Sequence, residues 1–421
     1  MERGEGLIMR FWGVTGTNGK TTVTWIAASF INAAKDRKCG YVTTVEVNTG
    51  ARRFSTGYTT PPLKQLNEIF AEMEANGCTD CVMEVSSHAI HQHRTGDTVF
   101  SGGVFTNLSE DHLDYHKTME AYFDVKLDFA RQIAAAHPTT PDMGRRDLPP
   151  YIVCLDGGYG KEMFNAVGNL AVNVIPVSVS TSTFDLDLLQ LVGAYNKSNV
   201  LCAAALAKAA GVPHDAIQAV IPTLKPRWGR LEEVEKRGGG GQWKARVFVD
   251  FAHTPDGLEK VLTAVREEMR RNSPSTSTSS LHLPSLWVVF GAGGDRDPMK
   301  RPLMGEACAK LADRLVVTSD NPRSEDPMAI IAAILKGVEN IVPDASSRRG
   351  AGAGLPSPRG EDASGTVFVE PDRKKAIEFA LREAGEDDVV IIAGKGHETT
   401  QEIKGVKHPF DDREIVRNFV G

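Results

Sequence analysis

The sequence predicts an α/β protein of two domains with mostly parallel sheets. At 421 residues the chain exceeds what one hydrophobic core usually serves, since single cores rarely grow past about 250–300 residues. Short apolar runs alternate with amphipathic segments of helical length along nearly the whole chain, which is typical of parallel strands connected by helices. The segment 222–227 carries two prolines before a new apolar run, so we expect domains at 1–222 and 223–421.

The individual elements follow from this alternation. Strands are expected at 7–14, 81–85, 103–105, 151–155, 246–251, 286–290, 314–318, 366–368 and 388–393. Helices are expected at 20–34, 62–76, 119–136, 196–210, 254–271, 300–311 and 374–384. Stretches rich in Gly, Ser, Pro or Arg cannot bury enough apolar surface to offset the entropy of ordering, so we expect disordered or mobile loops at 137–150, 238–241, 273–280 and 345–364.

Composition excludes several classes of protein. With 41% hydrophobic and 24% charged residues the chain has ordinary globular composition, and its apolar runs are too short for membrane spans. A formal net charge of −6 argues against nucleic acid as a partner. Cys78 and Cys81 form a C-x-x-C without a second pair, so we expect buried free thiols in a reducing compartment. Few residues precede the first apolar run, which leaves no room for a signal peptide and predicts a cytoplasmic protein.

A phosphate-binding loop is predicted where the segment 13–22, GVTGTNGKTT, follows an apolar strand and opens a helix. Backbone N–H groups at such a helix start hold phosphate oxygens. The common G-x-x-x-x-G-K-[ST] pattern needs glycine where this chain has Val14, and a glycine-rich turn with an incidental lysine is the alternative. The glycines instead match the variant G-x-x-G-T-[ND]-G-K-T. We therefore expect ATP phosphates and Mg²⁺ to bind at Gly16, Thr17, Asn18, Gly19, Lys20, Thr21 and Thr22.

Further segments occur with this loop: EVSSH at 84–88, FTNLSEDHLDYH at 105–116, GAYNKSN at 193–199, VDFAHTPD at 249–256, FGAGGDRD at 290–297, SDNPR at 319–323 and AGKGHE at 393–398. Together with the loop they resemble the Mur ligases and their folylpolyglutamate-synthetase relatives, and among the Mur ligases the tripeptide-forming member. The resemblance covers almost the whole chain. It implies a P-loop-containing central domain with a mostly parallel sheet, followed by a C-terminal Rossmann-like α/β domain.

The resemblance also implies an activity. Mur ligases transfer the γ-phosphoryl group of ATP to a carboxylate and let an amine attack the acyl phosphate. For this chain it implies addition of meso-diaminopimelate to a muramoyl-dipeptide-type acceptor in peptidoglycan precursor synthesis. The family's N-terminal, uridine-binding domain is expected to be absent, because the phosphate loop begins at residue 13, and a separate chain could supply it. The chain departs from the family at Trp228, where a small residue is usual, and at Phe251, where tyrosine is usual.

The resemblance assigns catalytic roles to Lys20, His112 and Lys126, and places Mg²⁺ at Thr21, Glu84, His112 and Lys126. A carboxylate suits hard Mg²⁺, whereas imidazole is a less usual ligand for it. By spacing alone Lys126 reads as a solvated helix lysine, but the resemblance implies that it carries a CO₂-derived carbamate. The histidines at 88, 91, 93, 112 and 116 could suggest zinc, yet they lack the Cys/His spacing of structural zinc sites.

Three further sets of residues come from the resemblance. The nucleotide is expected to meet Asn107, Arg230, Asp250, His253 and Asp320. The peptide acceptor is expected to meet Thr59, Thr60, Ser86, Gln92 and Arg94, although a turn before Pro61 explains the two threonines equally well. The diamino acid is expected to meet Arg296, Asn321, Arg323, Gly394 and Glu398.

Arg323 stands where the family places a cation, and the resemblance therefore implies diaminopimelate rather than lysine as the amine. Diaminopimelate carries a second carboxylate, and a guanidinium binds a carboxylate through a fork of two hydrogen bonds. The alternative is that Arg323 pairs with Glu325 or Asp326 on the surface.

Two other functions remain open at this stage. One is a related amide ligase whose acceptor is not linked to a nucleotide, such as a polyglutamylating enzyme, which the absence of the first domain favours. The other is a non-catalytic, nucleotide-binding Mur-like protein. Retention of Lys20, Glu84, His112, Lys126 and Asp320 favours an enzyme.

Overall fold

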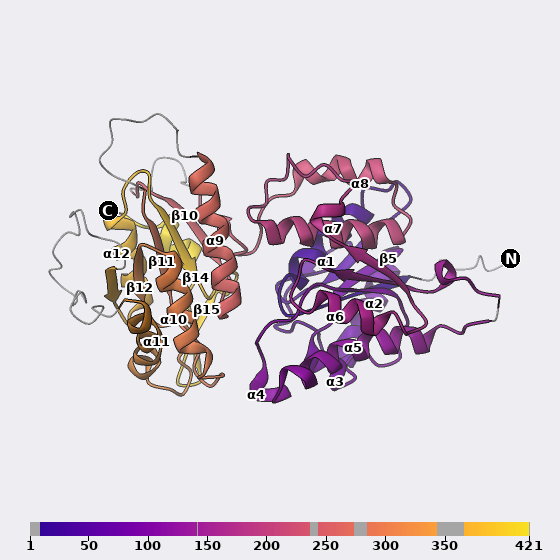
Figure 1. Cartoon of the computed structure of the whole chain (residues 1–421), viewed down its shortest axis with the longest axis horizontal. Helices are drawn as coiled ribbons and strands as arrows, with labels where there is room; N and C mark the ends of the chain where they lie inside the picture. The colour runs from indigo at the N-terminus through magenta and orange to yellow at the C-terminus, as the bar shows by residue number, and fades with distance from the viewer. Residues whose placement is uncertain (1–8, 141, 236–242, 273–283, 343–365, 421) are drawn as a thin grey trace. The chain divides into compact units, whose positions relative to one another are not determined.

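The computed structural model describes residues 9–140, 142–235, 243–272, 284–342 and 366–420 (Figure 1). The chain divides into two compact units, Met1–Lys225 and Pro226–Gly421. Each unit has its own largely parallel sheet, which confirms the predicted α/β fold class. The loops predicted at 238–241, 273–280 and 345–364 lie outside the described residues, as does the start of the strand predicted at 7–14.

The first unit is built on an eight-stranded sheet of order β4-β3-β2-β5-β1-β6-β7-β8. The strands from β2 to β8 in this order pair in parallel, and β3 and β4 extend one edge as antiparallel strands. β1 therefore lies between β5 and β6, at the point where the order of the parallel strands reverses. Ligands of open α/β sheets bind beyond the carboxyl ends of the strands at this point. The strands are β1 (Arg10–Thr15), β2 (Cys39–Val42), β3 (Val47–Asn48), β4 (Arg53–Phe54), β5 (Asp80–Glu84), β6 (Phe100–Phe105), β7 (Pro150–Cys154) and β8 (Asn173–Val177).

Helices cover both faces of this sheet (Figure 1). α1 and α7 pack against each other on one face, and α5 and α2 cover the other. Thr118 caps the start of α5, because its side chain accepts a hydrogen bond from the Ala121 N–H. The helices are α1 (Lys20–Ile31), α2 (Leu63–Ala75), α3 (Ser87–His91), α4 (Leu113–His116), α5 (Met119–Ala136), α6 (Gly160–Val167), α7 (Ala194–Ala209) and α8 (His214–Val220).

The second unit has a six-stranded sheet of order β13-β12-β11-β14-β10-β9, parallel except for the edge strand β9. β15 and β16 form a separate hairpin. The strands are β9 (Glu232–Glu233), β10 (Arg246–Asp250), β11 (Leu286–Phe290), β12 (Arg314–Val317), β13 (Thr366–Val369), β14 (Val389–Ala393), β15 (Thr400–Ile403) and β16 (Val406–Pro409). The helices are α9 (Pro255–Asn272), α10 (Lys300–Leu311), α11 (Pro327–Ile341), α12 (Arg373–Glu383) and α13 (Asp412–Arg417).

The largest element that the sequence reading missed is α11. It runs for 15 residues from its Asp326 cap, with proline in the first turn. Its buried side chains recur at helical spacing, including Ile330, Ile334 and Val338, so the signal was present in the sequence. The strands β2 and β8 were also missed. The predicted loop at 137–150 is described except for residue 141, and it contains a short 3₁₀ turn at Arg145–Asp147.

All six cysteines are buried free thiols, as predicted. Among the helices that the structure describes, none is long and apolar enough to cross a lipid bilayer.

A buried ion pair fixes the carboxyl ends of two strands in the second unit. Arg373 and Asp412 are completely buried and meet through two hydrogen bonds, of 2.9 Å from Nε and 2.8 Å from Nη2. The same guanidinium donates to the carbonyl of Ala393 at the end of β14 (2.9 Å) and to that of Ser319 beyond β12 (3.5 Å). Removing one partner of such a pair leaves an uncompensated buried charge, which costs about 3–5 kcal/mol.

Arg373→Met should therefore lower the free energy of unfolding by about 3–5 kcal/mol. Urea unfolding of the full chain, followed by circular dichroism, measures the change. Arg131→Met is the matched control, because Arg131 pairs with Asp124 and Asp128 on the surface, where about 0–1 kcal/mol is expected. Equal effects of the two substitutions would contradict the role given to the buried pair.

Candidate active site

The loop between β1 and α1 requires glycine at two positions. Gly16 and Gly19 have φ angles of 145° and 85°, which favour glycine. A Cβ at Gly16 would lie 2.0 Å from Thr106 Oγ1, and one at Gly19 would lie 2.4 Å from Asn199 Oδ1. At these two positions the loop packs too closely against its neighbours for a side chain. Asn199, from α7, was not predicted as a site residue, although it lies in the segment GAYNKSN.

The segment after β6 supports this loop from the side. Asn107 is joined to it by three hydrogen bonds: Thr17 N–H donates to its carbonyl (2.9 Å), Asn18 N–H donates to Oδ1 (3.0 Å), and Nδ2 donates to the Asn18 carbonyl (3.1 Å). Thr106 Oγ1 donates to the same Asn18 carbonyl at 2.6 Å. The loop is therefore held in one conformation through its polar backbone groups, and Asn107 lies beside it.

Oxygen donors suited to Mg²⁺ converge where α1 begins. Thr21 Oγ1 donates to Glu84 Oε1 at 2.8 Å, and Glu84, at the end of β5, is 1% exposed. Thr44, which the sequence reading missed, donates to the same carboxylate through its N–H (2.8 Å) and its hydroxyl (3.2 Å). A hydroxyl and a carboxylate are hard oxygen ligands of the kind that Mg²⁺ prefers.

Lys20 Nζ lies at the loop, 2.9 Å from the Gly16 carbonyl and within hydrogen-bonding distance of the Thr17 carbonyl. Thr22 is buried on the first turn of α1.

The reading of Lys126 as a solvated helix lysine is wrong. Its side chain is 1% exposed, because it follows the buried stripe of α5 between Tyr122 and Phe129. Nζ donates to Thr15 Oγ1 (3.0 Å) and to the Gly16 carbonyl (3.1 Å), so the amine reaches the base of the phosphate loop. Burial, reinforced by the nearby charge of Lys20, holds the pKa of Lys126 well below its ordinary value. The neutral form of the amine is therefore more accessible than in an exposed lysine.

His112 stands at the N-terminal cap of α4 with a φ of 54°. Its Nε2 lies 3.5 Å from Asp111 Oδ2, and its ring is 5.0 Å from that of His88. Burial lowers the pKa of His112, with the Asp111 carboxylate opposing the shift and the charge of Lys20 adding to it. The ring is therefore neutral near pH 7 and can act as a ligand or a hydrogen-bond partner.

A second histidine connects α3 to the loop. His116 Nε2 is 2.9 Å from Ser87 Oγ, and its ring stacks on Tyr122 with centroids 4.8 Å apart. The Tyr122 hydroxyl in turn lies 3.1 Å from Thr17 Oγ1.

In the part of the chain that the structure describes, no group of three or more His, Cys, Asp or Glu side chains is placed to hold a metal ion.

The five residues expected at the peptide acceptor share one hydrogen-bond network beside Glu84. Thr60 Oγ1 donates to the Glu84 carbonyl (2.8 Å) and accepts from the Ser86 N–H (3.0 Å). Arg94 donates to the Thr60 carbonyl at 3.3 Å and to Gln92 Oε1 at 2.9 Å. Because Thr60 is completely buried, its hydroxyl serves the fold of this turn. Thr59, whose Oγ1 accepts from Thr44 at 3.0 Å, is half-buried.

In the second unit, two loops at the carboxyl ends of β12 and β14 bring several predicted residues together. Asn321 Nδ2 donates to Glu398 Oε2 at 2.8 Å. Gly394 has a φ of 114°, and a Cβ there would lie 2.5 Å from Asp320 Oδ2. Lys395, which the sequence reading left without a role, lies completely buried among Asp320, Asn321 and Glu398.

The alternative prediction, that Arg323 pairs with Glu325 or Asp326 on the surface, is wrong. Glu325 instead pairs with Arg301 at 2.7 Å, and Asp326 caps α11. Arg323, with a φ of 53°, donates from Nη1 to the Gly294 carbonyl at 2.5 Å, and its Nε lies 3.6 Å from Glu402 Oε2. Its guanidinium is thus fixed by a carbonyl and one partly exposed carboxylate. Arg296 lies exposed on the neighbouring loop.

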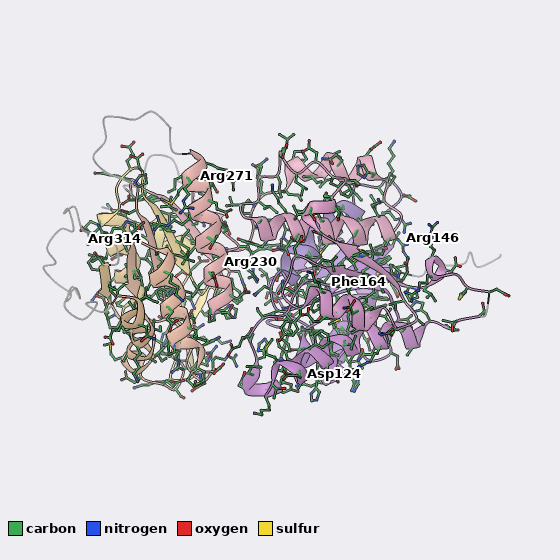
Figure 2. All side chains as sticks on the ribbon, in the orientation of Figure 1. Asp124, Arg146, Phe164, Arg230, Arg271 and Arg314 are labelled. Atoms are coloured by element: carbon green, nitrogen blue, oxygen red, sulfur yellow. The ribbon has the colours of Figure 1, made fainter. Side chains whose placement is uncertain are left out.

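The three nucleotide residues predicted near the start of the second unit gather around Phe251. The Arg230 guanidinium, labelled in Figure 2, lies 4.6 Å from the centre of the Phe251 ring. His253 packs against the same ring, and its Nδ1 is 2.8 Å from the Phe251 carbonyl. The Asp250 carboxylate accepts from the N–H groups of Leu231 and Ala252, each at 2.6 Å. Burial raises the pKa of Asp250, and the charge of Arg230 opposes this shift.

Comparison with known proteins accounts for both units. Residues 14–207 match the Mur ligase middle domain, and residues 229–396 match the Mur ligase, glutamate ligase domain. A UDP-N-acetylmuramoyl-L-alanyl-D-glutamate--2,6-diaminopimelate ligase from Geobacillus kaustophilus is 36% identical over 97% of this chain and 78% of its own length. The chain belongs to the Mur ligase family. It is an ATP-dependent amide ligase, since the family joins carboxylates to amines with ATP and Mg²⁺.

Other similar proteins support the same family assignment. The ligase of the same name from Synechococcus elongatus is 37% identical over 97% of this chain and 76% of its own. A solved structure of such a ligase superposes with a TM-score of 0.56 at 30% identity, over 97% of this chain and 77% of that one. Escherichia coli FolC, at 16% identity and a TM-score of 0.58 over 92% and 86%, shares the fold. The relatives carry their further domain within one chain, so the expectation that a separate chain supplies it is not supported.

Proposed function

We propose that this Mur ligase uses ATP and Mg²⁺ to join meso-diaminopimelate to UDP-N-acetylmuramoyl-L-alanyl-D-glutamate. The relatives are named as ligases of this acceptor and 2,6-diaminopimelate. The observation that carries the proposal is the arrangement around the phosphate loop. Lys20, the Thr21–Glu84 pair and the buried Lys126 all meet the same short segment. Lys20 and Glu84 are close enough to Lys126 for their charges to act on its pKa, the first lowering it and the second raising it.

The chemistry needs an activated carboxylate. N–H groups at the start of α1 bind phosphate oxygens, and Lys20 balances charge on the terminal phosphates. Thr21 and Glu84 would hold Mg²⁺, which neutralises phosphate charge when bound. The acceptor carboxylate then attacks the γ-phosphorus and releases ADP, and the amine of the second substrate attacks the acyl carbon and releases phosphate. Positioning and charge neutralisation supply most of the catalysis of such transfers.

The first test compares substrates. ADP release should require the muramoyl dipeptide, meso-diaminopimelate and Mg²⁺ together, and Lys20→Ala should lower it about a hundredfold, since charge contacts of this kind contribute on the order of 3 kcal/mol. Lys260→Ala, which breaks an exposed pair with Asp256, is the control and should leave turnover unchanged. Release driven by an acceptor without a nucleotide would favour a polyglutamylating type of ligase, and a Lys20→Ala rate within a few-fold of the parent would refute the loop's role.

Lys126 fits a carbamate. Only a neutral amine adds to CO₂, forming a C–N bond and releasing one proton, and burial beside Lys20 favours that form. The product is an anion at the base of the phosphate loop, where it could face a second Mg²⁺. Its charge would also lie near Lys20, which would then attract it.

Carbamylation can be observed directly. With ¹³C-labelled bicarbonate the parent should give a carbamate carbon signal that disappears in Lys126→Ala. That variant should be nearly inactive and partly recover in added short carboxylates, which replace the missing anion. Lys20→Ala, the matched control, should not recover, because it lacks a cation. A fully active preparation with no carbamate signal would rule the modification out.

The choice of diaminopimelate rests on Arg323. A lysine substrate would set its distal ammonium against this guanidinium, whereas the distal carboxylate of diaminopimelate matches the guanidinium fork. Arg323 Nε lies 3.6 Å from Glu402 Oε2, which is too long for a hydrogen bond. This pair therefore does not saturate the hydrogen-bond donors of the guanidinium. Glu398 would then bind the amine at the same end of the substrate.

Arg323→Ala should cut the use of diaminopimelate at least about a hundredfold in kcat/KM, while the KM for ATP stays nearly constant. Arg323→Lys keeps the charge but not the fork, so an intermediate loss is expected. Steady-state ADP release at varied diaminopimelate and varied ATP separates the two effects. Equal use of lysine and diaminopimelate by the parent protein would overturn this assignment.

A further inference from the structure

A fully buried lysine lies at the centre of the proposed amino-acid site. Lys395 follows β14 and is flanked by Gly394 and Gly396, whose φ angles are 114° and 51°. Its side chain is 0% exposed, so it cannot contact a substrate freely. The proposed function gives this residue no part in the reaction.

The ammonium of Lys395 reaches side chains from two loops. Nζ donates to Asn321 Oδ1 at 3.0 Å and to Glu398 Oε2 at 2.9 Å, and it lies 4.0 Å from Asp320 Oδ1. Asp320 and Asn321 follow β12, whereas Glu398 follows β14. Lys395 thus connects the ends of two strands that are not neighbours in the sheet.

These contacts determine which way the Asn321 amide points. Its Oδ1 accepts from Lys395 and also from the N–H of Glu402, at 2.9 Å. Two donors on one oxygen fix the orientation of the amide, so its Nδ2 must point the other way, toward Glu398 Oε2 at 2.8 Å. Without the lysine only the Glu402 N–H would hold that oxygen.

The same contacts fix the Glu398 carboxylate. The hydrogen bonds that it receives from the described residues, from Lys395 and Asn321, both fall on Oε2. The side chain is 33% exposed, so Oε1 is available to a ligand. Burial alone would raise the pKa of Glu398, but the charge and hydrogen bond of Lys395 and the bond from Asn321 outweigh it and hold the pKa below its ordinary value. The carboxylate is therefore ionised and oriented.

We propose that Lys395 is a positioning residue of the amino-acid site: it holds Glu398 and Asn321 so that Glu398 Oε1 receives the ammonium group of the incoming amino acid. Lys395 serves two carboxylates, Asp320 and Glu398, and the nearby Arg373 is paired with Asp412, so one negative charge remains, which suits a cationic amine. The inference deepens the proposed function and rests on it. Lys395 acts through Glu398 and touches no reacting atom.

The test is a double-mutant cycle on the KM for diaminopimelate. Lys395→Met keeps the length of the side chain and removes its charge. It should raise the KM for diaminopimelate about tenfold or more, because a hydrogen bond to a charged group is lost, while the KM for ATP changes less than about twofold. In a Glu398→Gln background the same substitution should change the KM by less than about twofold, because the carboxylate that Lys395 positions for the substrate ammonium has already been removed.

Arg314→Met is the matched control. Arg314 is a buried cation of the same unit at the opposite end of β12, where it donates to Thr366 Oγ1 at 2.9 Å (labelled in Figure 2). Its loss should lower the thermal unfolding temperature without a selective rise in the KM for diaminopimelate. If Lys395→Met does not fold, Lys395→Gln, which keeps a donor without the charge, takes its place in the cycle.

The outcomes separate the two claims. A parent protein without diaminopimelate-dependent ADP release refutes the proposed function and with it this inference. If the parent is active but Lys395→Met retains its KM for diaminopimelate, the inference is wrong and the proposed function stands. Additive effects of Lys395→Met and Glu398→Gln would also overturn it, since they would show a general structural role.

Discussion

The position of β1 between β5 and β6 is the constraint on which the first unit's site depends. Because the three strands are parallel, their carboxyl ends meet at one edge of the sheet. β1 ends in the phosphate loop, β5 ends in Glu84, and β6 leads into Asn107. Glu84 lies 63 positions from Thr21 and Asn107 lies 89 positions from Asn18, yet each is hydrogen-bonded directly to the loop residue. Gly16 and Gly19 then allow Thr106 and Asn199 to approach the backbone of the loop closely.

The sequence predicted the parts of the site that are local in the chain. The loop, the start of α1 and the ends of α5 follow from glycine placement and helical spacing. What depends on tertiary packing was not predictable in this way. The spacing of Lys126 predicted a solvated side chain, because a single lysine on an amphipathic helix usually reaches water. Only the fold shows that its side chain is buried and ends at the loop. Thr44 and Asn199 were missed for the same reason, since neither belongs to the loop motif.

In the second unit, the side chains that we propose to bind the amino acid are oriented by other residues. The DNPR and GKGHE segments drew attention to Asn321, Arg323 and Glu398, but the orientation of these side chains comes from Lys395, Gly294 and Glu402. The two buried lysines differ in their partners. Lys126 meets a hydroxyl and a carbonyl, which do not compensate a charge, whereas Lys395 meets a carboxylate. This difference agrees with the two proposals, a covalent modification of Lys126 and a carboxylate positioned by Lys395.

The central claim is that this chain activates a carboxylate by phosphorylation before an amine attacks it. The most direct measurement uses an acceptor whose terminal carboxylate is labelled with ¹⁸O, turned over with ATP, Mg²⁺ and meso-diaminopimelate. If the carboxylate attacks the γ-phosphorus, one labelled oxygen leaves with the inorganic phosphate, and mass spectrometry of the phosphate should find it in step with amide formation. Amide formation that leaves the phosphate unlabelled would contradict the account.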